Sequence, residues 1–208
     1  NALYKSTDGG KKWQKMAEKN MGDRPFYYSE IYVNPKNEYM VYSVHSQITR
    51  SVDGGKTFER FVGFWDIHPD HHAFWIHPDD PDFIIDGNDG GLNISHDGGR
   101  TWRYAENIPV GQFYHLNLDN ERPYNIYGGL QDNGTWIGPS ASWKASGMRN
   151  SDWQEIYFGD GFDAMPQRDN PRYAFAMSQG GELSHIDRQT GDTRYIKPLH
   201  PEGIELRF

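Results

Sequence analysis

Four aspartates stand in short turns rich in glycine, asparagine and histidine, and their carboxyl groups suit acid–base chemistry. They are Asp66, Asp89, Asp132 and Asp160. Two carboxyl groups that flank a glycosidic bond can hydrolyse it, with retention at a separation of about 5–5.5 Å and with inversion at about 6.5–9.5 Å. We therefore predict these four residues as catalytic candidates, and the sequence does not indicate which of them pair.

Amide, imidazole and aromatic side chains accompany these aspartates in the same segments. Amides and carboxylates can form paired hydrogen bonds with hydroxyl groups, and aromatic rings can stack on the apolar faces of sugars. The pattern thus favours a neutral, polyhydroxylated ligand. The residues predicted to bind it are Trp65, His71, His72, Asn88, Tyr114, Gln131, Asn133 and Gln179.

These polar groups also have structural interpretations. Aspartates in Asp-Gly and Asp-Asn-Gly turns often accept hydrogen bonds from the backbone of their own loop. In an extended segment, His68, Asp70 and His72 would alternate onto one side and could hold a divalent metal. Because Pro69 and the turn-like surroundings oppose regular alternation, we predict neither a metal site nor a cofactor.

A repeated turn indicates which elements carry these residues. Segments 6–13, 51–58 and 95–102 align without a gap, and a fainter copy spans 184–195. Each of the three combines Ser-x-Asp-Gly-Gly with a basic residue and a closing Trp or Phe, which is the pattern of the Asp-box. The adjacent glycines supply the positive φ that tight hairpins need. We therefore predict a structural role for the box aspartates Asp8, Asp53 and Asp97, which lie 45 and 44 residues apart.

This period of about 45 residues has room for four short strands, the size of a β-propeller blade. We predict an all-β fold, a β-propeller segment of four-stranded antiparallel blades with the Asp-box between the third and fourth strands. One domain would hold about four and a half blades: a partial blade at 1–16, blades at about 26–62, 72–105, 112–157 and 161–196, and a tail at 197–208. The candidate residues then fall at the blade ends opposite the boxes, an end that we call the rim.

Composition narrows the classes of function. The chain has 208 residues, with 21 Lys and Arg against 29 Asp and Glu, and a net charge of −8. This balance opposes binding to nucleic acid, whose phosphates require a basic surface. The absence of cysteine excludes disulfides and thiol nucleophiles. No stretch approaches the roughly 18 consecutive apolar residues of a membrane span. Aromatic residues make up 15% of the chain, and their large side chains are expected to build the core of a globular fold.

Several motifs, in order, carry a family resemblance: residues 70–78, 87–95, 112–114, 127–134 and 159–162. The chain resembles the large bacterial BNR/Asp-box proteins of the "glycosyl hydrolase" type, which are similar to sortilin-type ligand-binding propellers and to xyloglucanases. The resemblance covers nearly the whole chain. It implies part of a longer, exported protein, either secreted or located in the periplasm or at the cell surface.

Two functions from different classes remain open on this basis. The first is binding of a glycan at the rim, where the carboxylates could also hydrolyse it. The alternative is a non-catalytic, sortilin-like propeller that recognises a protein or peptide. A typical sialidase site within this segment is disfavoured, since that site needs a cluster of arginines and only Arg24 lies in a suitable loop.

Overall fold

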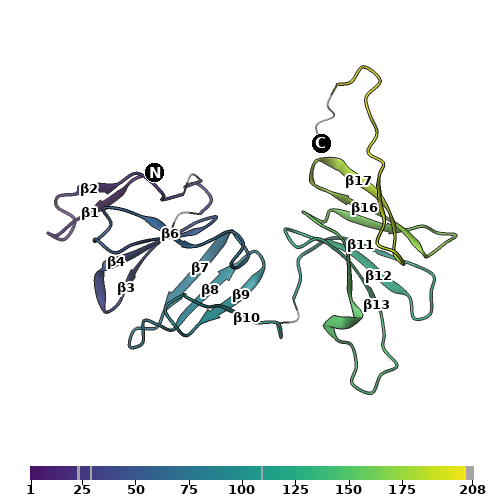
Figure 1. The fold of residues 1–208 in the computed structure, drawn as a ribbon, viewed down its shortest axis with the longest axis horizontal. Helices are drawn as coiled ribbons and strands as arrows, with labels where there is room; N and C mark the ends of the chain where they lie inside the picture. The colour runs from purple at the N-terminus through teal and green to yellow at the C-terminus, as the bar shows by residue number, and fades with distance from the viewer. Residues whose placement is uncertain (23, 29, 109, 205–208) are drawn as a thin grey trace. The chain divides into compact units, whose positions relative to one another are not determined.

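The computed structural model describes residues 1–22, 24–28, 30–108 and 110–204. The described chain consists of β-strands joined by turns, with two short 3-10 segments, η1 (Asn150–Asp152) and η2 (Gln179–Gly181). Its contacts divide it into two compact units, residues 1–109 and 110–208. Figure 1 shows the strands of both units.

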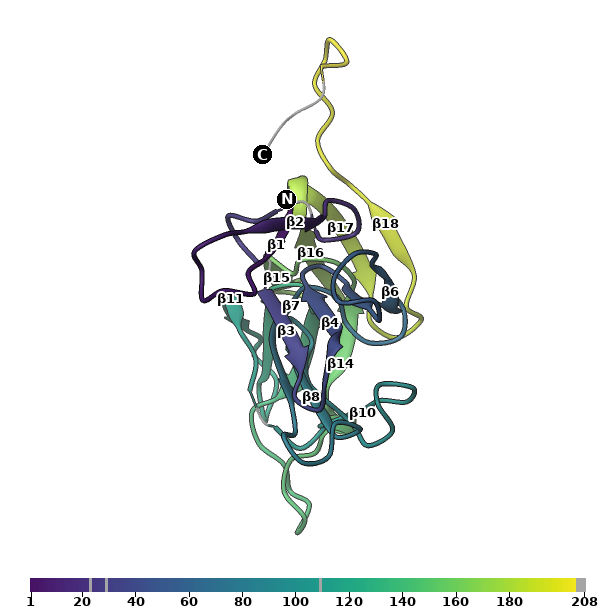
Figure 2. The ribbon, with the colours of Figure 1, turned by 90° about the vertical axis from the view of Figure 1, so that its left-hand side faces the viewer.

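The N-terminal unit contains three antiparallel sheets. A two-stranded sheet precedes two four-stranded sheets, and in each the strands pair in chain order. Figure 2 shows β3 and β4 side by side in the first four-stranded sheet. The strands are β1 (Leu3–Lys5) and β2 (Gln14–Ala17); β3 (Glu30–Asn34), β4 (Asn37–Val44), β5 (Ile48–Ser51) and β6 (Glu59–Val62); and β7 (His71–Ile76), β8 (Ile84–Asn88), β9 (Gly91–Ser95) and β10 (Arg103–Tyr104).

The C-terminal unit contains two four-stranded antiparallel sheets, again with strands paired in chain order. The segment that joins β13 (Thr135–Pro139) to β14 (Gln154–Tyr157) contains η1. After the last strand the described chain leaves the sheet as an extended segment (Figures 1 and 2). The strands are β11 (Phe113–Leu118), β12 (Asn125–Leu130), β13 (Thr135–Pro139) and β14 (Gln154–Tyr157); and β15 (Asp163–Pro166), β16 (Tyr173–Ser178), β17 (Glu182–Asp187) and β18 (Thr193–Tyr195).

These sheets confirm the predicted all-β architecture of four four-stranded antiparallel blades and a two-stranded half-blade. The repeated turns join the third and fourth strands of their blades: β1 to β2, β5 to β6, and β9 to β10. The assignment of all 208 residues to one domain stays a prediction. Within each blade the strand order places the rim at the opposite end from the repeated turns.

The three repeated turns share a set of hydrogen bonds made by their serine and aspartate side chains. In the turn of Asp97, the serine hydroxyl of Ser95 donates to Oδ1 at 2.9 Å and accepts the Gly99 N–H at 2.8 Å. The Thr101 N–H donates to the same carboxylate oxygen at 2.9 Å. The glycines of the turns have φ between +70° and +90°, a region where a Cβ is costly. The carboxylates are therefore occupied by their own turns, as the structural interpretation requires.

Each core cluster lies between neighbouring sheets of one unit. In the N-terminal unit, Tyr42 and Ile48 of one blade pack with Phe74 and Ile84 of the next. In the C-terminal unit, buried residues of β12 and β13 meet small alanines of β15 and β16. The closing aromatic of the second repeated turn, Phe58, is 4% exposed, in a cluster formed with the preceding half-blade.

The closing aromatics of the other two repeated turns differ in burial. Trp102 packs partly buried against the core between β3–β6 and β7–β10. Trp13, by contrast, is 64% exposed. The aromatic of the turn thus packs against the sheet that comes before it, and within the described residues no sheet precedes the half-blade that carries Trp13.

Candidate functional site

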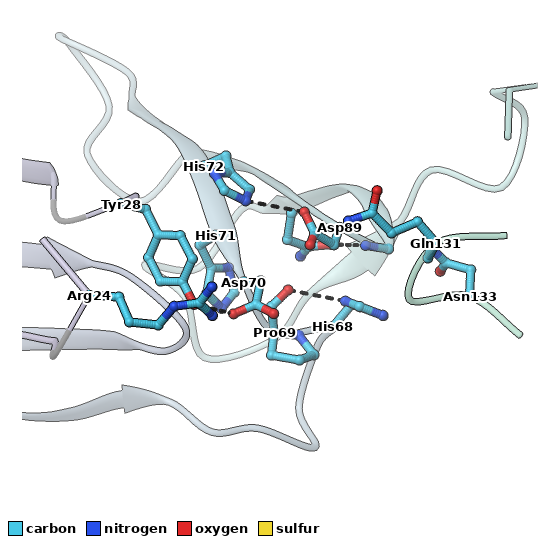
Figure 3. Close-up of polar contacts among 12 residues, drawn as sticks. Arg24, Tyr28, His68, Pro69, Asp70, His71, His72, Asp89, Gln131 and Asn133 are labelled. Atoms are coloured by element: carbon cyan, nitrogen blue, oxygen red, sulfur yellow. Dashed lines mark hydrogen bonds and ion pairs between the residues drawn. The ribbon is translucent and has the colours of Figure 1, made fainter. Parts of the chain in front are cut away.

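In the N-terminal unit, an aromatic and charged group lies where β7 begins and β8 ends. We call it the N-terminal rim cluster and define it as Arg24, Tyr28, Asp70, His72 and Asp89. The Tyr28 hydroxyl donates to Oδ1 of Asp70 at 2.6 Å, and Nε2 of His72 lies 3.2 Å from Oδ1 of Asp89 (Figure 3). Burial, and next the hydrogen bond to Asp70, raise the pKa of Tyr28 to about 12.

Ring contacts join the pair of Tyr28 and Asp70 to the pair of His72 and Asp89 in the N-terminal rim cluster. The imidazole of His72 meets the ring of Tyr28 edge-on, with 5.2 Å between ring centroids. The guanidinium of Arg24 lies 5.3 Å from the Tyr28 centroid and donates to its hydroxyl at 3.3 Å. The cluster thus combines a cation, two carboxylates and aromatic edges at one end of two neighbouring blades.

Backbone hydrogen bonds hold the loops of this cluster together across the two blades. The Asp70 N–H donates to the carbonyl of Ser46 at 3.2 Å, and the Asp89 N–H donates to the carbonyl of Asp70 at 3.2 Å. The His71 N–H reaches the carbonyl of His45 at 2.9 Å. Because these loops bind one another, the cluster is preorganised without a ligand.

His71 and Asn88, both predicted as ligand contacts, hold the loops together through side-chain hydrogen bonds. The role of the partly exposed Asn88 in ligand binding stays a prediction. His71 is 2% exposed, and its Nδ1 lies 2.9 and 3.0 Å from the two carboxylate oxygens of the buried Asp86. Asn88 donates to the same carboxylate at 2.9 Å and accepts the Gly90 N–H at 3.0 Å. A side chain as buried as His71 has no surface to offer a ligand, so its place is beneath the rim.

Asp66 and Trp65 lie in the loop between β6 and β7, and they differ in their surroundings. Oδ2 of Asp66 accepts the Gly63 N–H at 2.7 Å, a bond within its own loop. Trp65 is 90% exposed and touches Phe64 edge-on at a centroid distance of 4.9 Å. The aspartate therefore has the structural partner that turn aspartates usually have, while the indole is open to solvent.

A second group lies at the rim of the C-terminal unit. We call it the C-terminal rim cluster and define it as Tyr114, Asp132, Asp160, Phe162 and Gln179. The rings of Tyr114 and Phe162 stack in parallel, with centroids 4.8 Å apart and planes 2° apart. Oδ1 of Asp160 accepts the Asp132 N–H at 2.6 Å, and Oε1 of Gln179 accepts the Asp160 N–H at 2.8 Å.

The two aspartates of the C-terminal rim cluster lie near the phenol. Burial raises the pKa of Tyr114, and the negative charges of Asp160 and Asp132 raise it further. Of the four predicted catalytic carboxylates, these two are brought together, because one binds the backbone of the other. Asp66 and Asp89 belong to the N-terminal unit, and each has the partners described above.

Glycines make this close approach of two loops feasible. A Cβ added to Gly129 would lie 1.9 Å from the carbonyl oxygen of Gly161, and one added to Gly161 would lie 2.2 Å from the carbonyl oxygen of Gly134. No side chain can occupy such positions. The glycines therefore allow the loop between β14 and β15 to lie directly on β12 and its turn.

The Asn133 side chain and the Trp136 indole bind the backbone of the turn between β12 and β13. Nδ2 of Asn133 donates to the carbonyl of Gln131 at 2.8 Å, and Nε1 of Trp136 donates to the carbonyl of Asn133 at 2.7 Å. Gln131 and Asn133 are both partly exposed. Their predicted role in ligand binding stays a prediction.

The histidines and carboxylates of the described residues do not form a metal-ligand group. Among the residues that the structure describes, no three His, Asp or Glu side chains come together as metal ligands would. Asp70 has φ +59° and precedes β7, and Nδ1 of His68 lies 3.0 Å from the carbonyl of Pro69. The segment is therefore a turn, without the alternation that a metal site from His68, Asp70 and His72 would need. No helix in the described ranges is long and apolar enough to cross a membrane.

Sequence reasoning missed the most connected residue of the N-terminal rim cluster. Tyr28 binds Asp70 across 42 positions of sequence, and a lone Tyr-Tyr pair before a strand carries no signal for that contact. Asp86 was also left out, although it anchors His71. Asp86 lies two residues after the buried Ile84 on β8, so its side chain points to the same buried face of the sheet.

Comparisons with known proteins give structural likeness alone. No protein-family model matches the chain, and no curated protein matches it by sequence. Among solved structures, the GH74 xyloglucanase from Xanthomonas campestris is 13% identical, with a TM-score of 0.41 over 94% of this chain and 34% of its own. YCF48 from Cyanidioschyzon merolae is 15% identical, with a TM-score of 0.37 over 94% and 66%. A structure of YCF48 bound to D1 peptide is 12% identical, with a TM-score of 0.39 over 95% and 62%. This chain thus spans about a third of the xyloglucanase and under two thirds of the YCF48 chains.

Proposed function

We propose that this chain is a segment of an exported Asp-box propeller of the BNR type that binds a glycan through its rim. The observation that carries the proposal is the C-terminal rim cluster, where stacked aromatic rings stand beside two carboxylates. Tyr114 is 39% exposed, so part of its ring is available to a ligand. A flat ring next to fixed hydrogen-bond acceptors is the combination that recognises a sugar, with its apolar face and its hydroxyl rim.

Hydrogen bonds within the cluster fix its acceptors in advance. The Asp160 carboxylate is bound by one backbone N–H, and the Asp160 backbone is itself bound by Gln179. A ligand therefore meets loops that are already ordered and does not bear the cost of ordering them. Each carboxylate oxygen has more than one acceptor direction, so a bond to the backbone leaves Asp160 able to accept from a hydroxyl group.

We extend the proposal to hydrolysis through Asp132 and Asp160. Their loops are in direct contact, which is the first requirement for two carboxyl groups that act on one bond. One of them would protonate the leaving oxygen and the other would act as base or nucleophile. The alternative proposal is that the rim recognises a protein or peptide without catalysis, and the experiment below separates the two.

The test measures binding and hydrolysis of a polysaccharide panel by the protein and its variants. Tyr114→Ala removes the stacking ring and is expected to weaken glycan binding about tenfold, or roughly 1.4 kcal/mol. Asp132→Asn and Asp160→Asn are expected to abolish the release of reducing ends. Asp66→Asn and Asp89→Asn, in the N-terminal unit, are measured alongside them.

Asp192→Asn is the matched control, because Asp192 is an exposed turn aspartate of the same unit. It is expected to retain both binding and hydrolysis. Hydrolysis at the wild-type rate in both Asp132→Asn and Asp160→Asn would refute the catalytic assignment. Failure of every glycan to bind would refute the glycan proposal and favour recognition of a protein or peptide.

A further inference from the structure

We propose that a cavity at the opposite end of the C-terminal unit binds a single neutral sugar residue, or a polyol of similar size. The cavity measures about 510 Å³ and lies where β11 and β15 end. The turns that follow these strands complete its wall, with residues 117–121 on one side and 165–168 and Pro171 on the other. Its volume is within the range of about 300–1,000 Å³ that is typical of small-molecule sites.

This cavity is distinct from the rim. β11 and β15 are the first strands of their blades and start at the rim, so their last residues lie at the end where the repeated turns are found in the other blades. A ligand here would not touch the C-terminal rim cluster. The inference therefore does not depend on the proposed function of the rim.

Amide groups on the cavity wall are held in fixed positions. Nδ2 of Asn117 donates to Oδ1 of Asp163 and to the carbonyl of Ala164, both at 2.8 Å. Oε1 of Gln167 lies 3.1 Å from Nε2 of His185. These bonds occupy the nitrogen of one amide and the oxygen of the other. The Asn117 oxygen is left to accept a hydrogen bond and the Gln167 nitrogen is left to donate one, and hydroxyl groups can satisfy both.

The charges of the cavity favour a neutral ligand. The carboxylate of Asp119 accepts four hydrogen bonds: from the Asn125 N–H at 2.7 Å, from Asn125 Nδ2 at 2.7 Å, from the Tyr127 hydroxyl at 3.1 Å and from the Glu121 N–H at 3.2 Å. Burial opposes its ionisation, but these bonds outweigh it and lower the pKa of Asp119. Its charge is thus compensated within the protein. Glu121 and Arg168 add one charge of each sign.

Apolar side chains form the remaining wall. Leu118 is 57% exposed and Met165 is 53% exposed, and both line the cavity with Pro166 and Pro171. Exposed apolar surface beside fixed amides matches a sugar ring, whose C–H face packs on apolar groups while its hydroxyls bind the amides. The geometry therefore accounts for both kinds of surface with one class of ligand.

The test follows the methyl signal of Met165 by ¹³C NMR while methyl glucoside, galactoside, mannoside or xyloside is added. Met165 is assigned by the loss of its signal in Met165→Leu. A ligand of about a dozen heavy atoms is expected to bind with a Kd on the order of 1–10 mM. Gln167→Ala and Arg168→Ala should weaken binding at least about fivefold, a loss of roughly one hydrogen bond.

Matched controls are Gln189→Ala and Arg194→Ala, which change the same residue types at exposed positions of the same unit. Both should bind the glycoside as the unchanged protein does. The proposal is overturned if no neutral glycoside shifts Met165 at roughly 100 mM, well above the expected Kd. It is also overturned if the two cavity variants bind as tightly as the controls, or if methyl glucuronide alone shifts the signal, since a charge would then be recognised. Retention of the Met165 shift in Tyr114→Ala would separate this cavity from any failure of the rim.

Discussion

Removal of one partner from the buried pair of His71 and Asp86 is expected to cost the N-terminal unit several kcal/mol of stability. The two side chains are 1% and 0% exposed. Because an ionised carboxylate only accepts hydrogen bonds, Nδ1 of His71 must carry the proton between them. Asp86→Ala would remove the acceptor of His71 and also that of Nδ2 of Asn88. A buried donor without a partner costs about 1–3 kcal/mol.

The size of the effect follows from the different exposure of the two donors. His71 is enclosed and pays the full cost, whereas Asn88 is partly exposed and can recover a bond with water. Together with the small cavity left by the carboxylate, we expect a loss of about 3–5 kcal/mol in the free energy of unfolding, the range observed when one partner of a buried pair is removed. Few changes in a domain of this size cost more.

Hydrogen exchange of the β7 and β8 amides measures this loss in the unit that contains the pair. The matched control is Asp79→Ala in the turn between the same two strands. The Asp79 side chain is 83% exposed and lies 3.3 Å from Nζ of Lys36, so its loss should cost less than about 1 kcal/mol. Equal effects of the two substitutions, or a loss below about 1 kcal/mol for Asp86→Ala, would refute the reasoning.

Three further expectations concern the repeated turns and the rim. The hydrogen bond from the Thr101 hydroxyl, and next that from its N–H, lower the pKa of Asp97 to about 2. Its contribution to stability is therefore complete above the unfolded value near 3.8 and lost as the pH falls through about 2, so Asp97→Asn should flatten acid unfolding in that window. Gly129→Ala should lower the free energy of unfolding by at least about 1–3 kcal/mol, because the added Cβ would meet a backbone carbonyl. Thermal unfolding measures this loss. Gly111→Ala, which meets only the tip of a leucine, should cost less. Trp65→Ala should leave stability within roughly 0.5 kcal/mol, because the indole is 90% exposed, and a stability loss above 1 kcal/mol would contradict its exposure.

The blades and the repeated turns could be predicted from the sequence because both depend on short-range chemistry. In the turn of Asp97, every partner of the carboxylate lies within four residues, so the pattern itself contains the structure. The strands follow from the same local signals of turn glycines and β-branched or aromatic runs. A period of about 45 residues then orders them into blades.

The contacts of the candidate site could not be predicted in the same way, because they join distant residues. His71 meets Asp86 through the pairing of β7 with β8, whose register shifts between His71 and Ala73. Without that register, His71 could equally be placed on the exposed side of the strand, where it was expected to bind a ligand. Asp132 and Asp160 meet because two loops lie on glycines, and the sequence states where the glycines are but not what lies against them.

Backbone strain separates the rim from the repeated turns. At the repeated turns, glycines take the positions of positive φ. Among the described residues, three residues other than glycine have positive φ. Two of them are Asp70 and Asp132 of the rim clusters. A side chain in this conformation costs free energy that glycine avoids. Asp70 uses its side chain to accept the Tyr28 hydroxyl, so its carboxylate offsets the strain locally. Asp132 stands in the equivalent conformation beside Asp160 and Tyr114, at the place where the proposed ligand would bind. A carboxylate at a position where glycine would relieve the backbone is consistent with the role that we propose for Asp132 at the rim.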